Sequence, residues 1–197
     1  MPSIVDICNL ALSHLGKGAI ASLAESSEAA RACNLHYEII RDKSLEDFPW
    51  RFAQRQVNLS LRSGITVVGW VYVYAYPANC LSVNKVFTPA TYTEPEPQPF
   101  DEFNPDGTKS IVTNLQDAYA EFTARITDPV LFSPLFVTAM AFHLASDIAV
   151  KLTCNDGKRN DMLRIYYQKL QEAKNASAQQ RYDKPKLAKT YTTGRWG

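Results

Sequence analysis

The spacing of apolar residues predicts helices at both ends of the chain and strands between them. Apolar side chains recur every three or four positions over residues 4–15 and again over about 26–47, which is the period of an amphipathic helix. Ser3 is placed to cap the first of these helices and Gly16 to end it. Pro49 lacks a backbone N–H, so it ends or kinks the second helix.

After the second helix apolar residues alternate with polar ones, which predicts that the middle of the chain forms strands. Val57, Leu59 and Leu61 alternate with polar neighbours in this way. The sequence Asn104-Pro105-Asp106-Gly107 is a strong turn signal and predicts a hairpin between the strands that flank it. The strands expected in this region comprise residues 57–61, 70–76, 81–87, 100–103, 109–113 and 119–126.

The strand at residues 70–76 shows the most regular alternation. One side consists of Trp70, Tyr72, Tyr74 and Tyr76, and the other of Val71, Val73 and Ala75. Neither side carries a charge, so we expect both to be covered. A side rich in Tyr suits a contact with another protein chain, because each ring is apolar with a polar tip. Burial of the strand within its own sheet explains the same pattern equally well.

Helical periodicity returns after residue 127. Asp128-Pro129 and Ser133-Pro134 each combine a capping residue with a first-turn proline. The helix predicted over residues 134–152 is apolar on most sides, which suits the centre of a bundle or a subunit interface. His143, Asp147 and Lys151 make it a better buried helix than a membrane span. Asn155-Asp156-Gly157 is expected to form a turn before a last helix over residues 158–180.

These elements predict an α+β protein built around a four-helix bundle. Residues 1–55 and 128–180 are expected to form a discontinuous helical bundle domain. Residues 56–127 are expected to form a β-rich insertion domain between the second and third helices. Residues 181–197 lack a helical stripe and are expected to form an extended C-terminal arm.

Composition and charge exclude several classes of protein. The 197 residues allow one domain with an insertion, and the net charge of +1 gives no global field toward nucleic acid or membrane. Cys8, Cys33, Cys80 and Cys154 show no C-x-x-C spacing. The N-terminus lacks the pattern of a signal peptide, so we expect a reduced, cytosolic protein.

No motif in the chain predicts catalysis. Nucleotide-binding, hydrolase and metal-ligand patterns are missing, so we expect no enzymatic activity, no cofactor and no metal. His143 and Asp147 lie four residues apart and could form a proton relay, but a satisfied pair inside a bundle fits the same spacing. Arg51 and Arg55 could contact a DNA backbone or could simply be surface arginines.

Two segments have compositions that set them apart. Four prolines mark residues 88–99 as an exposed loop whose role stays open. Residues 181–197 carry five basic residues and one acidic residue, a local charge of +4, together with aromatic residues. A frayed chain end would explain the lack of a helical stripe, but a solvated tail seldom carries a Trp and two Tyr, so the composition favours an arm that orders on a partner. The candidate docking residues are Lys184, Lys186, Lys189, Tyr191, Arg195 and Trp196.

The order of several short motifs resembles one known family. The segments concerned are Ile20-Ala21-Ser22-Leu23-Ala24-Glu25, Ala29-Ala30-Arg31, Phe48-Pro49-Trp50-Arg51-Phe52-Ala53, Trp70 to Pro77, Cys80-Leu81, Arg125-Ile126-Thr127-Asp128-Pro129 and Ala145-Ser146-Asp147. In this order and spacing they resemble the tail tubular protein A family, the head-to-tail adaptors of short-tailed bacteriophages. The resemblance extends from about residue 4 to residue 180. It implies a helical bundle interrupted by a β-rich insertion.

The resemblance also implies a function and a set of partners. Such adaptors are structural virion proteins that form a ring of twelve subunits beneath the portal, join it to the tail or nozzle and continue the DNA channel. They are assembled in the host cytoplasm and lie in the neck of the virion. The C-terminal arm would then dock on the portal, the Trp70–Tyr76 side would contact a neighbouring subunit or the tail, and Arg51 and Arg55 would contact DNA in transit. The alternative is a monomeric phage-associated binding or assembly module that forms no ring.

Overall fold

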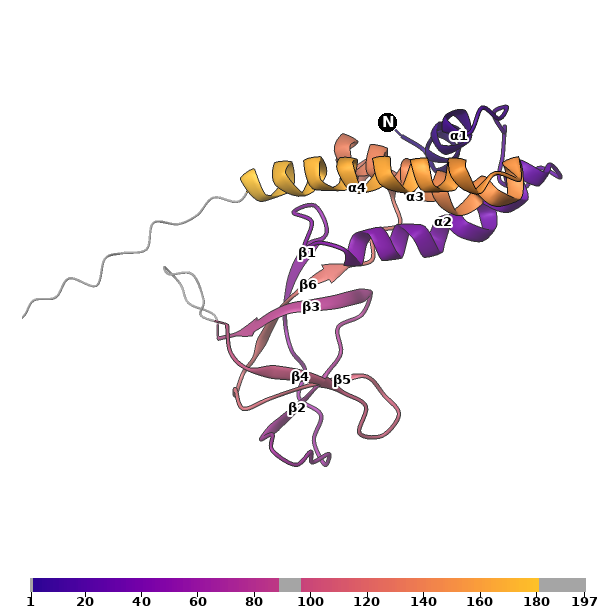
Figure 1. The fold of residues 1–197 in the computed structure, drawn as a ribbon. Helices are drawn as coiled ribbons and strands as arrows, with labels where there is room; N and C mark the ends of the chain where they lie inside the picture. Colours follow the sequence, from indigo (N-terminus) through magenta and orange to yellow (C-terminus); the bar gives the residue numbers. More distant parts are fainter. Residues whose placement is uncertain (1, 89–96, 181–197) are drawn as a thin grey trace, which may run out of the picture.

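The chain is a mixed α+β protein in which helices lie at one end and strands at the other (Figure 1). The computed structural model describes residues 2–88 and 97–180. These residues form four α-helices and two small antiparallel sheets. The helices are α1 (Ile4–His14), α2 (Glu28–Glu46), α3 (Pro134–Thr153) and α4 (Asp156–Gln179), with a 3-10 turn η1 (Pro129–Leu131). The strands are β1 (Gln54–Asn58), β2 (Tyr72–Ala75), β3 (Cys80–Phe87), β4 (Phe100–Phe103), β5 (Ser110–Thr113) and β6 (Tyr119–Ala124).

Each helix begins at a side chain that satisfies its free N–H groups. The Ser3 hydroxyl accepts a hydrogen bond from the Asp6 N–H at 3.1 Å, and the Asp6 carboxylate accepts one from the Ser3 N–H at 2.8 Å. Ser27 and Ser133 cap α2 and α3 in the same manner. The predicted turn at residues 155–157 is wrong, because Asn155 caps α4 and the two following residues form its first helical turn. The chain instead changes direction between α3 and α4 at Cys154, whose backbone has the left-handed conformation with φ 51°.

Helix α3 is the centre of the helical end. It packs against α1, α2 and α4, and its Phe136, Met140, Leu144 and Ile148 are fully buried. Among the described residues it is the one helix long and apolar enough to cross a membrane. Because α3 is packed against three other helices, burial in the protein core explains its apolar composition.

Backbone hydrogen bonds connect the two sheets to each other at two places. In one sheet the strand order is β1-β6-β3 and in the other β2-β5-β4. Beyond β1 the chain leaves β6 and runs along β2, since the Arg62 N–H donates to the Val73 carbonyl and the Ala75 N–H to the Ser60 carbonyl, each at 2.8 Å. On the other side the Gln98 N–H, just before β4, donates to the Val86 carbonyl at 2.7 Å.

These bonds give the strands a closed path. The order around it is β1, β2, β5, β4, β3, β6 and back to β1, as in a small barrel. The strand predicted at residues 57–61 therefore belongs to two sheets, because β1 ends at Asn58 and Leu61 bridges to Tyr74. The predicted hairpin is confirmed, since residues 104–109 join β4 to β5.

Two clusters of buried apolar residues underlie these elements. The larger contains the inner faces of all four helices and extends to Phe122, Ala124 and Ile126 at the end of β6. The smaller fills the space between the strands and contains Leu59, Tyr74, Val86, Ile111, Ala118 and Ala120. Strand β6 contributes to both clusters, so the helices are packed directly onto the first sheet.

Aromatic rings pack where the chain passes from helices to strands. Trp50 is fully buried and lies 5.2 Å from Phe48 and 5.0 Å from Phe136, measured between ring centroids. Phe52 contacts both Phe136 and Phe132, at 5.1 and 5.8 Å. The return of the chain runs alongside, because the Ala124 N–H donates to the Ala53 carbonyl at 2.8 Å. We call Phe48, Trp50, Phe52, Phe132 and Phe136 the aromatic junction.

Candidate functional site

The Tyr-rich side of the strand around β2 lies largely within the chain's own core. Tyr74 is 2% exposed, and its hydroxyl donates to the Leu115 carbonyl at 2.9 Å. Val73, on the opposite side of the strand, is also buried. Both sides of β2 therefore contact this chain at their centre, and Tyr74 is removed from the surface offered to a partner.

The neighbours of Tyr74 are also held by contacts within the strands. The Tyr76 hydroxyl donates to Glu102 at 3.1 Å, and the Lys109 ammonium lies 3.9 Å from the Tyr76 ring centroid. Tyr72 is partly buried, with its ring 6.3 Å from that of Tyr74. Trp70 is partly buried, and its backbone closes a tight turn with Val67.

The exposed residues of this region are aliphatic. Val68 is fully exposed at the tip of the turn before β2, next to Gly69 at φ 88°. Val71 is 69% exposed and Leu61 is 58% exposed. We call Leu61, Val68 and Val71 the aliphatic tip. The prediction that both sides of the strand at residues 70–76 are covered is therefore wrong at Val71.

Arg51 and Arg55 are both exposed, at the start of β1. The Arg51 guanidinium donates to the Gln54 side chain at 3.1 Å, and its backbone N–H donates to the Ser177 hydroxyl of α4 at 3.1 Å. The Arg55 guanidinium donates to the carbonyls of Phe52 and Gln54 at 3.0 and 2.8 Å. Both side chains lie near the aromatic junction, and contact with a DNA backbone stays a prediction.

Other predicted sites fall outside the described residues. These are the six docking residues of the C-terminal arm, Lys184, Lys186, Lys189, Tyr191, Arg195 and Trp196. Most of the proline-rich loop, residues 89–96, lies outside them as well. Their roles stay as predicted from the sequence.

Two groups of exposed apolar residues lie on the helical end. Leu35 and Ile39 are one turn apart on the outer face of α2 and are 62% and 66% exposed. The second group is at η1 and the start of α3, where Val130, Leu131 and Leu135 are each at least 40% exposed. Exposed apolar groups that flank each other on a helix surface are typical of contacts with other chains.

Helices α2, α3 and α4 are joined by a buried polar network. Ser44 of α2 and His143 of α3 are hydrogen-bonded through Oγ and Nδ1 at 3.0 Å, and the His143 ring stacks on Tyr166 of α4 at 4.2 Å. The Tyr166 hydroxyl donates to Asp47 at 2.6 Å, and the Trp50 indole N–H donates to the Ser44 carbonyl at 2.8 Å.

Burial favours the neutral forms of His143 and Tyr166 in this network. Burial, with the nearby Lys43 charge as a second cause, lowers the pKa of His143. Burial and the hydrogen bond to Asp47 raise the pKa of Tyr166. His143 pairs with Ser44, whereas Asp147 is exposed on the next turn of α3. Ser44 and His143 are both about 2% exposed, so the pair has no access to a substrate and acts as a contact between helices.

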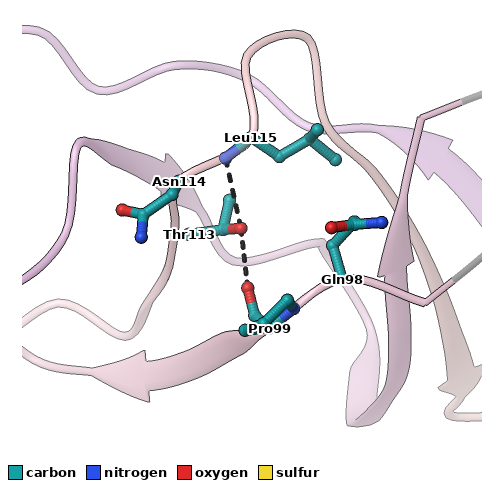
Figure 2. Close-up of a pocket in the computed structure, with 5 residues that line it drawn as sticks. All are labelled: Gln98, Pro99, Thr113, Asn114 and Leu115. Atoms are coloured by element: carbon teal, nitrogen blue, oxygen red, sulfur yellow. Dashed lines mark hydrogen bonds between the residues drawn. The ribbon is translucent and has the colours of Figure 1, made fainter.

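A shallow hollow of about 90 Å³ lies beside the second sheet (Figure 2). Its walls are Gln98, Pro99, Thr113, Asn114 and Leu115. The Thr113 hydroxyl, which donates to the Pro99 carbonyl at 2.8 Å, already has a partner within the wall (Figure 2). Ligand pockets are usually several times larger, at about 300–1,000 Å³, so this hollow suits no more than a few water molecules. Within residues 2–88 and 97–180, no three His, Cys, Asp or Glu side chains gather as metal ligands would.

No family model matches the chain, and no curated protein matches it either.

Proposed function

We propose that the chain is a structural virion protein, a head-to-tail adaptor of the tail tubular protein A type. In this proposal it is a helical bundle, residues 1–55 and 128–180, interrupted by a β-rich insertion at residues 56–127. Copies form a ring, of twelve subunits by the resemblance, that joins the portal to the tail or nozzle and continues the channel for DNA. The role is structural and needs no catalytic residue, cofactor or metal.

The observation that carries the proposal is the ordered set of short motifs along the sequence. Residues 48–53 contribute three rings to the aromatic junction, and residues 125–129 form the return crossing beside it. Arg125 also reaches back to the helices, since its Nε lies 2.9 Å from a carboxylate oxygen of Asp42. Two of the motifs that carry the resemblance, residues 48–53 and 125–129, thus lie where the helices meet the strands, which supports a family likeness in architecture.

The exposed apolar groups on the helices support assembly into a ring. A ring is built from a heterologous interface, in which one surface of each subunit contacts a different surface of the next. Leu35 and Ile39 on α2 supply one such surface, and the η1–α3 corner supplies another. At the other end the bridges Leu61–Tyr74 and Val86–Gln98 cover part of the sheet edges, which favours contact through side chains there.

The charge of the chain suits a channel through which DNA passes without stopping. The net charge is +1, so the affinity for phosphate is low. Arg51 and Arg55 are the proposed points of passing contact with the backbone. The C-terminal arm, with Tyr191 and Trp196 among basic residues, is the proposed anchor on the portal.

Electron microscopy of the chain, alone and mixed with its portal, tests the ring directly. We expect rings on the portal, and a molar mass that stays at 22.1 kDa in the presence of portal would instead favour the monomeric binding module. Deletion of residues 191–197 should abolish portal binding. Val68→Ser, which leaves the C-terminal arm intact, is the control and should bind the portal normally. Unchanged affinity after the deletion would refute the anchor.

The subunit contact is tested on α2. Leu35→Ser with Ile39→Ser should prevent ring formation while leaving circular dichroism and melting temperature nearly unchanged, because both side chains are already in water. Tyr74→Ser is unsuitable for this purpose, since Tyr74 belongs to the core. Normal rings formed by the α2 double variant would exclude this face from the interface.

A further inference from the structure

Strand β1 has a neighbouring strand on one side only, where it pairs with β6. The Ala53 carbonyl accepts a hydrogen bond from the last residue of β6, and the Leu59 N–H donates to the Ala118 carbonyl directly before β6, each at 2.8 Å. Every second residue of an antiparallel strand bonds the same partner, so Arg55 and Val57 also bond β6. The residues between them direct their N–H and C=O groups away from β6.

Gln56 and Asn58 have these outward groups and are both exposed. The preceding residue of the same set, Gln54, is already satisfied, since its N–H donates to the Trp50 carbonyl at 3.0 Å and its carbonyl accepts from the Arg55 guanidinium at 2.8 Å. Among the described residues, none bonds the backbone N–H and C=O of Gln56 and Asn58 on this side. We call these four backbone groups the open edge of β1.

Strand β2 covers the continuation of this edge but stops before it. The Ser60 carbonyl accepts a hydrogen bond from β2 at 2.8 Å, on the same side of the chain as the open edge. Continuing the pairing of Leu61 with Tyr74 would place Pro77 opposite Asn58. Proline has no N–H to donate, so β2 cannot extend the ladder. An open edge of this kind can take up a further strand.

We propose that residues 187–193 of the C-terminal arm form this further strand in the isolated chain. The end of α4 lies beside the start of β1, because the Ser177 hydroxyl accepts a hydrogen bond from the Arg51 N–H at 3.1 Å. The linking residues 181–186 can span about 20 Å, and a strand of the length of β1 is about 17 Å long. The segment can therefore reach the open edge of its own chain.

The composition of residues 187–193 suits a strand. The segment contains three Thr and one Tyr, which favour extended backbone, and it has neither Pro nor Gly. Pro185 lies before it and Gly194 follows it, so the arm offers a strand-forming run between two breakers. Lys189 is its one charged residue, so the segment brings little charge toward the exposed Arg55.

This proposal goes beyond the adaptor function, since it says where the arm lies before any partner is present. If the same arm anchors the portal, the portal and the open edge of β1 compete for it, and the edge stores the arm until assembly. The test uses no portal, so its failure would leave the adaptor proposal unaffected.

Amide hydrogen exchange, measured for each residue by nuclear magnetic resonance, tests the proposal on the full chain and on a chain that ends at residue 186. The Gln56 and Asn58 amides should exchange at least about tenfold more slowly in the full chain, because each N–H gains an acceptor. The Arg55 and Val57 amides should exchange equally in both chains, because β6 already binds them. Equal rates at Gln56 and Asn58 in the two chains would overturn the proposal.

A matched pair of variants in the full chain separates strand pairing from other effects of the arm. Thr190→Pro/Tyr191→Pro removes two successive N–H groups from the segment and should return Gln56 and Asn58 to fast exchange. Thr190→Ala/Tyr191→Phe keeps both N–H groups and should keep the slow exchange. Slow exchange in the proline variant would overturn the proposal. Slow exchange that disappears on dilution would overturn it as well, since the strand would then come from a second copy.

Discussion

Trp50 provides the most direct test of how the helices are held to the strands. It is fully buried at the aromatic junction, and its indole N–H donates to the Ser44 carbonyl at 2.8 Å. Trp50→Phe keeps a ring in contact with Phe48 and Phe136 but removes the donor. The Ser44 carbonyl is then left buried with one partner fewer, directly beside the hydrogen bond between Ser44 and His143.

The cost of this substitution has two parts. Loss of a partner by a buried polar group costs about 1–3 kcal/mol. The smaller ring leaves a void that adds on the order of 1 kcal/mol. The free energy of unfolding should therefore fall by roughly 2–4 kcal/mol. Trp70→Phe is the matched control, because Trp70 is only partly buried at a turn, and we expect it to cost under about 1 kcal/mol.

Urea unfolding followed by far-ultraviolet circular dichroism measures both variants without depending on Trp fluorescence. The urea midpoint should fall for Trp50→Phe at an unchanged slope of free energy against urea, because the same surface is exposed on unfolding. Equal losses for the two variants, or a loss at Trp50 below about 0.5 kcal/mol, would contradict the assignment of Trp50 as the residue that joins helices to strands.

Three further predictions concern pH, backbone conformation and the aliphatic tip. Burial lowers the pKa of both His14 and His143 from 6.5, so the unfolded chain binds more protons just below that pH. The free energy of unfolding should fall as the pH drops below about 6.5, and a melting temperature equal at pH 7.5 and 5.5 would contradict this. Gly107 has φ 81° in the β4–β5 turn with open space around its Cβ position, so Gly107→Ala should cost on the order of 1 kcal/mol by strain alone. Gly18→Ala, at an ordinary φ with equal space, should cost less, and equal urea midpoints would refute the strain. Val68→Ser should leave the urea midpoint within error, since the Val68 side chain is fully exposed; a large loss would show that the tip packs in solution.

The local elements could be predicted because their causes are local. The period of apolar residues defines the four helices to within about two residues, capping serines mark the starts of α1, α2 and α3, and a turn sequence defines the β4–β5 hairpin. The start of α4 was missed because Asn155 suits both a turn and a cap. The boundary of β1 was missed because alternation continues where the strand exchanges one partner for another.

Contacts between distant residues could not be predicted in this way. Ser44 and His143 are 99 residues apart in sequence, and Tyr166 and Asp47 are 119 apart, so no spacing rule connects them. Alternation around β2 showed that two sides exist but not where each is covered: Val73 and Tyr74, on opposite sides, are both buried, whereas Val71 is exposed.

The closed path of the strands has a consequence for many copies held close together. An open strand edge presents unpaired N–H and C=O groups, onto which a second molecule can add a strand, and repetition of that step yields fibres. Here the chain's own backbone covers part of the sheet edges, since Leu61 bridges to Tyr74 of β2 and Gln98, just before β4, bridges to Val86 of β3. At high concentration this protein should therefore be less prone to grow into fibres by adding strands. Association through side chains, which can end at a fixed number of copies, should be favoured instead.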